Sequence, residues 1–200
     1  MQYYFNQKKI NRINCKAAVP ILFYFYPSNS DMKNILLLSC ILFLSSISLH
    51  AQDATTLVKT GDPLPVFNFE IEKGKQVSIA DFKGKVVWIN FFATWCGPCR
   101  TELPFLHQQV WEKYKNDSRF ALFIFGREEG WQKVTAFKNE NKFTFPMLPD
   151  ENREIFKRFA TQSIPRNIII NKEGVIVYQS TGFSPEEFKK AISVLDQLLK

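Results

Sequence analysis

The chain has 200 residues, of which 46% are hydrophobic, 15% aromatic and 22% charged, and its formal net charge is +7. This length and composition fit one packed domain and exclude a disordered or fibrous chain. The four cysteines are too few and too unevenly spaced for a disulfide-stapled mini-protein or a zinc site built from two matched pairs.

Residues 32–51 have the pattern of a secretory signal peptide. A lysine follows the methionine, and an apolar stretch of 15 residues, 35–49, ends in small or polar residues. The stretch is interrupted by serines and is shorter than the roughly 20 residues that a membrane-spanning helix needs. We therefore expect cleavage after Ala51, with an uncleaved membrane anchor or a lipoprotein site at Cys40 as the alternatives.

Residues 1–31 match no targeting signal of ordinary length. We interpret them as sequence upstream of the true start at Met32, or else as an unusually long basic leader. Removing residues 1–51 leaves 149 residues with 21 basic and 18 acidic side chains and no cluster of either sign. The small remaining charge of +3 gives no support to nucleic-acid binding.

After a short linker at 52–60, residues 61–200 alternate strand and helix patterns. Two runs, 86–92 and 120–125, are almost wholly apolar, which is typical of strands covered on both faces. In chain order we predict strands at 67–71, 76–79 and 86–92, a helix at about 97–114, a strand at 120–125, helices at 130–140 and 153–159, strands at 167–171 and 175–179, and a last helix. This order predicts an α/β fold.

The last helix is the best marked. Ser184 is a predicted N-cap, Pro185 takes the first helical position, and Glu187 completes a capping box. Apolar side chains then recur at helical spacing, so one face of the helix is expected to pack on the sheet.

The predicted exported chain has its sulfur chemistry in one motif, Cys96-Gly97-Pro98-Cys99. The motif follows a buried strand and begins a helix, so Cys96 lies where free backbone N–H groups and the helix dipole favour a thiolate. Cys96 is therefore the predicted nucleophile, and Cys99, one turn further in, is the resolving thiol. Pro98 preforms the first helical turn, and Gly97 allows a partner chain to approach closely.

Two structural interpretations of the cysteine pair are weaker. A zinc site needs two more ligands, and His107 is the one histidine after the predicted cleavage point. A purely structural disulfide across a two-residue gap would add little stability. We therefore expect no metal and no cofactor other than a redox-active Cys96–Cys99 disulfide.

The run 86–104 resembles the thioredoxin superfamily. It has Trp95 before the first cysteine, the Gly-Pro dipeptide, and Pro104 five residues after Cys99. The exported leader, a Pro-x-Phe sequence at 65–67, the Ala-Thr-Trp-Cys run and Glu102 look most like the TlpA/ResA group of periplasmic thiol-disulfide oxidoreductases. The resemblance covers about residues 61–200. It implies a thioredoxin-like α/β fold, with a central mixed sheet flanked by helices and an N-terminal β extension.

The resemblance also implies roles for two polar positions. Thioredoxins place an aspartate where this chain has Asn90, and because an asparagine cannot titrate, we interpret Asn90 as a hydrogen-bonded structural amide. Glu102 is the available carboxylate, and in the resembling group a glutamate here lies under the cysteine pair and tunes its acidity. The alternative is a solvated helix glutamate. Trp95 is expected to shield the pair and contact partners.

In proteins of this type a cis proline faces the cysteines, and we assign that role to Pro165, with Ile164 offering backbone hydrogen bonds to an extended substrate segment. The usual threonine after the proline is Arg166 here. It either lies beside the site, where it favours acidic partners or stabilises the thiolate, or packs along the surface. Glu128 and Glu129 are interpreted as solvated charges of a loop or helix start.

The resulting functional hypothesis is a periplasmic thiol-disulfide oxidoreductase that works mainly as a reductant. Its partners would be disulfide-containing exported proteins, with cytochrome c maturation among the compatible processes, and a membrane thiol electron donor that recharges it. A redox-gated, non-catalytic binding module is the alternative from another class. A peroxiredoxin-like thiol peroxidase is less favoured because its usual Pro-x-x-x-Thr/Ser-x-x-Cys motif is absent.

Overall fold

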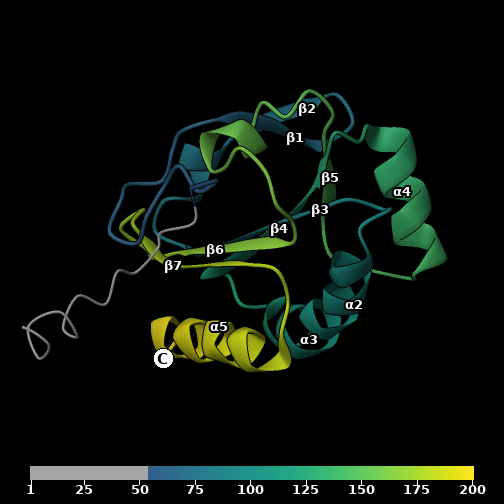
Figure 1. Ribbon diagram of the computed structural model, residues 1–200. Coiled ribbons are helices and arrows are strands. Elements are labelled where there is room, and N and C mark those ends of the chain that lie inside the picture. The colour runs from purple at the N-terminus through teal and green to yellow at the C-terminus, as the bar shows by residue number, and fades with distance from the viewer. Residues whose placement is uncertain (1–53) are drawn as a thin grey trace, which may run out of the picture. The chain divides into compact units, whose positions relative to one another are not determined.

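The computed structural model describes residues 54–200, so the predicted signal peptide and the residues before it lie outside the described part. Its centre is a five-stranded sheet in the order β5-β4-β3-β6-β7 (Figure 1). β3, β4 and β5 are parallel, and β6 and β7 are antiparallel to their neighbours. The strands are β3 (Val86–Phe92), β4 (Phe120–Arg127), β5 (Met147–Asp150), β6 (Arg166–Ile170) and β7 (Ile176–Thr181).

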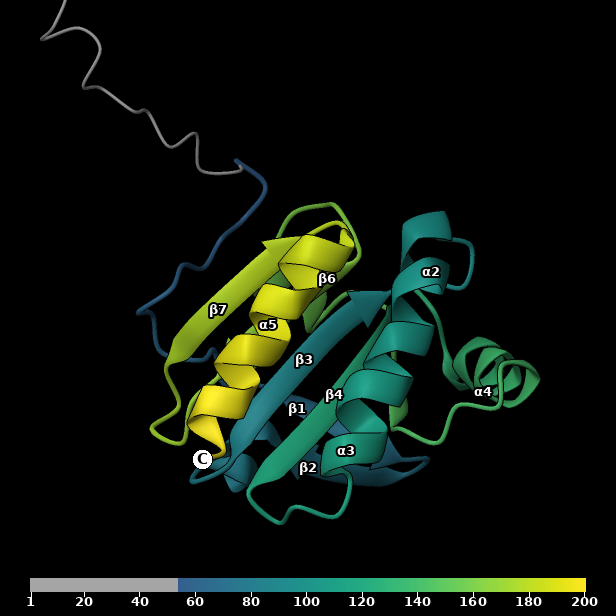
Figure 2. The same ribbon diagram turned by 90° about the horizontal axis from the view of Figure 1, so that it is seen from below.

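The two faces of this sheet are covered differently. Figures 1 and 2 show α2, α3 and α5 on one face, with the hairpin of β1 and β2 on the other. The covering elements are β1 (Asn68–Glu72), β2 (Lys75–Ser78), the 3-10 turns η1 (Ile79–Phe82) and η3 (Phe156–Arg158), and the helices α2 (Gly97–Phe105), α3 (Glu112–Tyr114), α4 (Trp131–Glu140) and α5 (Pro185–Leu198). Helices on one side and a β extension on the other bury β3 and β6 completely, whereas the edge strand β7 is only partly buried.

β3 lies at the centre of the molecule, and each of its residues is buried. Successive side chains of a strand point to opposite faces, so Trp88 and Phe92 join the apolar cluster under the helices, while Ile89 and Phe91 join the cluster under the hairpin. The almost wholly apolar run 86–92 was therefore a sound basis for predicting a strand covered on both faces.

The structure corrects two predicted elements. β5 was not predicted, because Pro146 and Pro149 bracket its apolar residues. Proline is tolerated there since β5 is an edge strand. The helix predicted at 153–159 is only the short turn η3, Phe156–Arg158. The other predicted strands are present, with their ends shifted by at most two residues.

Two predicted helices are present, but one changes its helical geometry along its length and the other is capped differently from the prediction. The helix predicted at 97–114 contains Pro104, and after α2 it widens into a π-helical turn, η2 (Leu106–Trp111), before α3. In α5, the Ser184 hydroxyl accepts from the Glu187 N–H at 3.2 Å. The Glu187 carboxylate instead accepts from the Tyr178 hydroxyl at 2.9 Å, so only half of the predicted capping box forms.

The segment interpreted as a linker packs on the domain where it is described. Thr56 forms an antiparallel bridge with Ala160, and Val58 is buried under the hairpin side of the sheet. Within residues 54–200, none of the helices has the length and apolar character needed to cross a bilayer.

Candidate active site

The two cysteines of the motif lie just beyond the end of β3. Cys96 is the N-cap of α2 and Cys99 lies in its first turn, and the two are joined by a disulfide with Cα atoms 5.3 Å apart. The Cys99 N–H points to the Cys96 sulfur, with a nitrogen–sulfur distance of 3.3 Å. Cys96 is 5% exposed and Cys99 is fully buried, which fits a nucleophile in front of a resolving thiol.

Sheet register brings a second loop to the same place. β6 pairs antiparallel with β3, with Asn167 opposite Asn90, so the residues just before β6 lie beside the end of β3. The Ile164–Pro165 peptide bond in this loop is cis. The Ile164 carbonyl oxygen lies 3.9 Å from the Cys96 sulfur. A backbone acceptor thus stands beside the more exposed sulfur of the pair.

A hollow of about 340 Å³ opens over the reactive sulfur. Its lining residues come from the cysteine motif, the end of β4 and the loop before β6: Trp95, Cys96, Gly97, Pro98, Arg127, Ser163 and Ile164. The Trp95 side chain is 65% exposed, so an apolar surface borders the disulfide and is available to a partner chain.

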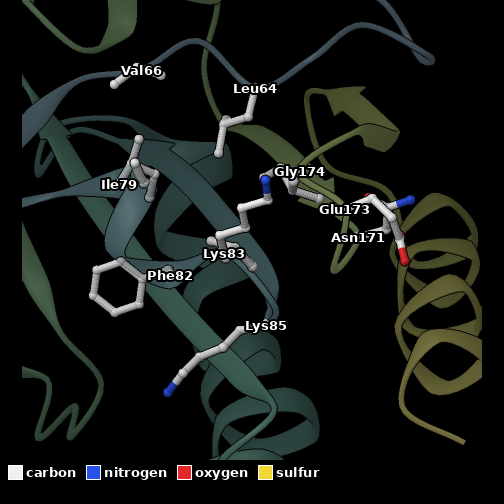
Figure 3. A pocket seen from close by; sticks show the side chains of 12 residues that line it. Leu64, Val66, Ile79, Phe82, Lys83, Lys85, Asn171, Glu173 and Gly174 are labelled. Carbon is white, nitrogen blue, oxygen red and sulfur yellow. The ribbon is translucent and has the colours of Figure 1, made fainter.

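A second hollow, of about 170 Å³, lies at the opposite end of the sheet (Figure 3). It is bordered by apolar side chains such as Leu64 and Ile79 and by Lys83 and Lys85. None of its lining residues is a cysteine or histidine, whereas the hollow over Cys96 is lined by a sulfur of the disulfide pair.

Beneath the helix that carries the cysteines, a buried polar network surrounds Glu102. Its two carboxylate oxygens accept from the Asn90 amide at 2.9 Å and from the Asn167 amide at 2.6 Å. The Asn167 oxygen accepts in turn from Asn90 at 2.8 Å and from the Trp88 indole N–H at 2.9 Å. An indole nitrogen can only donate, so Trp88 fixes which end of the Asn167 amide faces Glu102.

Burial and hydrogen bonding act on Glu102 in opposite directions. Removal from water raises its pKa from 4.5 to about 7, and the amides of Asn167 and Asn90 limit the rise because they favour the charged form. Glu102 is 1% exposed, so the alternative of a solvated helix glutamate is wrong. The interpretation of Asn90 as a hydrogen-bonded amide is confirmed. A carboxyl group that exchanges a proton near neutral pH therefore lies one turn along α2 from Cys99.

Asn167 belongs to this network but was not predicted. It is a buried amide at the second position of β6, between Arg166 and three isoleucines. The available sequence signal was a polar side chain at the start of a predicted central strand, because such a side chain needs a buried partner.

Glu129 is a second buried carboxylate near the motif, so its interpretation as a solvated charge is wrong. Both of its oxygens accept from the Thr94 N–H at 3.1 Å, and one accepts from the Thr94 hydroxyl at 2.6 Å. Thr94 lies in the loop between β3 and α2, where the Arg100 guanidinium also donates to its carbonyl oxygen at 3.2 Å. Glu129 thus fixes the loop that carries Trp95 and Cys96. Its neighbour Glu128 is exposed.

Arg166 is neither a surface side chain nor part of the hollow over Cys96, which corrects both interpretations of it. It is buried at the start of β6. Its guanidinium donates to the Thr56 hydroxyl at 2.8 Å, the Thr55 hydroxyl at 3.3 Å and the Gln162 carbonyl at 3.3 Å. Arg166 therefore ties the first described residues to the loop before β6.

No group of three or more His, Cys, Asp and Glu side chains within residues 54–200 is arranged to hold a metal ion.

The chain is similar to known proteins both in sequence and in fold. The model of the Redoxin family matches residues 59–199. The thiol-disulfide oxidoreductase ResA of Bacillus subtilis (strain 168) is 30% identical over 131 residues, which are 64% of this chain and 71% of that protein. The thioredoxin-like protein YneN of the same organism is 33% identical over 119 residues, 60% of this chain and 69% of that protein. The solution structure of a candidate protein disulfide isomerase from Bacteroides thetaiotaomicron has a TM-score of 0.69 and 35% identity, covering 72% of this chain and 92% of that one.

Proposed function

Because the chain belongs to the Redoxin family and is a thiol-disulfide oxidoreductase, we propose that it works mainly as a reductant of disulfides in exported proteins. The predicted thioredoxin-like fold, a mixed sheet flanked by helices with an N-terminal β extension, is confirmed. The observation that carries the proposal is the Cys96–Cys99 pair, which lies at a helix N-terminus, beside the Ile164 carbonyl, with the buried Glu102 carboxylate one helical turn after Cys99.

The reaction begins with the reduced pair. The Cys96 thiolate attacks one sulfur of the substrate disulfide, so a bond forms between Cys96 and that sulfur while the other substrate sulfur leaves as a thiolate and takes up a proton. Cys99 then loses its proton, for which the Glu102 carboxylate is a suitable acceptor, and attacks Cys96. The second substrate sulfur leaves and is protonated. Two electrons have passed from the protein to the substrate, one of the two protons gained derives from Cys99 and the other from solvent, and the protein holds the Cys96–Cys99 disulfide.

The loop before β6 supports binding of an extended chain. The Ile164 carbonyl borders the hollow over Cys96, where it can accept a backbone N–H from a substrate segment that lies alongside. The exposed Trp95 on the other side of the sulfur offers apolar contact. A segment held between them would present its disulfide to Cys96.

Direction and location of the reaction rest on sequence features. The dipeptide between the cysteines is that of thioredoxin, whose reduction potential is about −270 mV against about −120 mV for the oxidant DsbA. The leader at 32–51 supports export, and we place the working protein in the periplasm. The oxidised pair would then be recharged by a thiol donor in the membrane, and apocytochrome c is one candidate substrate.

The test is reduction of insulin disulfides by the purified protein together with measurement of its potential against glutathione. We expect turnover by the wild type, none by Cys96→Ser, and a potential near that of thioredoxin. A potential near −120 mV, or equal turnover by Cys96→Ser, would contradict the proposal. In cells, Cys99→Ala should accumulate mixed disulfides on Cys96, which identify the substrates. Unchanged cellular function of a variant with both cysteines changed to serine would instead favour a binding module.

A further inference from the structure

The hollow over Cys96 has one charged lining residue, Arg127. Arg127 is the last residue of β4, and the register of β4 on β3 pairs Gly126 with Phe92. Arg127 is therefore one residue beyond the end of β3, level with the loop that leads into the cysteine motif. Its charge reaches the hollow from the opposite side to the Ile164 loop.

Aromatic rings hold the Arg127 side chain in place. Its guanidinium carbon lies 5.7 Å from the centre of the exposed Trp95 ring and 5.4 Å from the centre of the buried Phe156 ring. Both distances are within the range of cation–π attraction. The side chain is only 13% exposed, so the charge has a fixed position beside the reactive sulfur.

The hydrogen-bonding capacity of this guanidinium is almost unused. Within residues 54–200, Arg127 has one charged partner, Glu128, at 3.4 Å between Nη2 and Oε2, and its buried Nε has no acceptor. Glu128 also pairs with Arg153 at 3.3 Å, so two guanidinium groups share one carboxylate. The nearby Glu129 carboxylate is occupied by Thr94. A largely enclosed guanidinium whose buried Nε has no acceptor is unusual, because buried donors are normally hydrogen-bonded.

We propose that Arg127 binds a carboxylate on the substrate segment, so that the protein prefers disulfides with an acidic residue next to the cysteine that Cys96 attacks. This inference rests on the proposed disulfide reduction. A guanidinium offers parallel N–H donors that match a carboxylate. The acidic preference that the sequence suggested for Arg166 is thus assigned to Arg127, which lines the hollow.

The experiment uses three peptides with an intramolecular disulfide that differ only in the residue after the attacked cysteine: Glu, Gln or Lys. We expect the wild type to reduce the Glu peptide about tenfold faster, in kcat/KM, than the Gln peptide, with the Lys peptide slowest. Arg127→Met keeps an apolar stem over the rings and removes the charge, so its Glu/Gln ratio should fall to about 1. The ratio is taken within each protein, so a change in Cys96 reactivity cancels.

Arg153→Met is the matched control, because Arg153 shares Glu128 and the Phe156 ring with Arg127 but does not line the hollow. It should keep the wild-type Glu/Gln ratio. Equal rates on the Glu and Gln peptides in the wild type, or an undiminished ratio in Arg127→Met, would overturn the inference. The wild-type comparison stands even if the variant fails to fold. Failure to reduce any of the peptides would overturn the proposed reductase activity, and the inference with it.

Discussion

Two buried carboxylates lie near the disulfide, and they are held by different chemistry. Glu102 accepts from side-chain amides beneath the cysteine helix, and burial raises its pKa to about 7. Glu129 accepts from the backbone and hydroxyl of Thr94, in the loop before Cys96. The first is suited to exchange a proton with the thiol pair, and the second is suited to hold the loop in place.

We therefore predict that Glu129→Gln loosens the loop before Cys96. A glutamine has one acceptor oxygen and presents an NH₂ group toward the Thr94 N–H, so a hydrogen bond to a charged acceptor is lost. We expect the free energy of unfolding to fall by about 1–3 kcal/mol. Hydrogen exchange of the Thr94 amide should also become faster, which NMR can measure directly.

The adjacent Glu128 provides the matched control for this prediction. Glu128 is exposed, and its contacts are ion pairs with Arg127 and Arg153. Glu128→Gln should cost less than about 1 kcal/mol and leave Thr94 exchange unchanged. Equal effects of the two substitutions on Thr94 would show that burial of Glu129 does not fix the loop.

These residues also show how far the site could be predicted from the sequence. Cys96, Cys99 and Glu102 are close in sequence on one helix, so their spacing alone places them together. Asn167 and Glu129 reach the site from β6 and from the end of β4, and only the register of those strands on β3 reveals the contact. For Arg166 the sequence left two places open, beside the site or on the surface, and the structure shows neither, because the side chain is buried against Thr55 and Thr56.

At the scale of elements, apolar runs and helix-capping residues predicted most of the fold. β3, β4 and α5 have strong local patterns, and each was found where it was expected. β5 has a weak local pattern, since Pro149 within it is permitted only by its place at the sheet edge. The prediction of a helix at 153–159, where the structure has only the turn η3, was wrong for a related reason. Apolar residues at 155, 156 and 159 fit helical spacing, but in the structure their burial against the hairpin side of the sheet needs only a short turn.

The first turns of α5 also contact the polar network around Glu102, through the Trp88 ring. Phe188, in the first turns of the helix, packs on Trp88 with ring centres 5.9 Å apart, and Trp88 orients Asn167 toward Glu102. Ser184→Ala removes the side chain that caps the Glu187 N–H. We expect a loss of about 1 kcal/mol in the free energy of unfolding, measured by urea denaturation of the oxidised protein.

Ser118→Ala is a suitable control for the capping prediction, because Ser118 is exposed in a turn outside the helices and strands. It should change stability by less than about 0.5 kcal/mol. If Ser184→Ala cost no more than Ser118→Ala, the hydroxyl of Ser184 would not stabilise the start of α5.

At the scale of the whole molecule, the sheet separates two apolar clusters with different tasks. The helix side contains both cysteines and packs around the indole of Trp88. The hairpin side contains Phe156, whose ring holds Arg127 at the rim of the hollow. The helix side thus supports the cysteine pair, and the hairpin side supports Arg127. Because the site needs both faces of the sheet, its stability depends on the packing of the whole domain.

Burial of Glu102 should therefore make the free energy of unfolding of the whole domain depend on pH. Its pKa is 4.5 when exposed and about 7 in the folded, oxidised protein. A raised pKa means that the folded state binds the proton more tightly than the unfolded state, so the contribution of Glu102 to stability is fully present below about pH 4.5 and is lost as pH rises through about 7. The loss is about 3 kcal/mol for such a shift.

Urea denaturation of the oxidised wild type and of Glu102→Gln at pH 5 and pH 8 tests this linkage. Glutamine does not titrate, so the difference between the two proteins isolates Glu102, while other groups, including the buried Asp150 whose pKa is also raised, contribute equally to both. Relative to the variant, the wild type should lose most of those 3 kcal/mol between the two pH values. Parallel stability in the two proteins would mean that Glu102 keeps an ordinary pKa when folded. It would then be charged throughout this range and unsuited to exchange a proton with Cys99 near neutral pH.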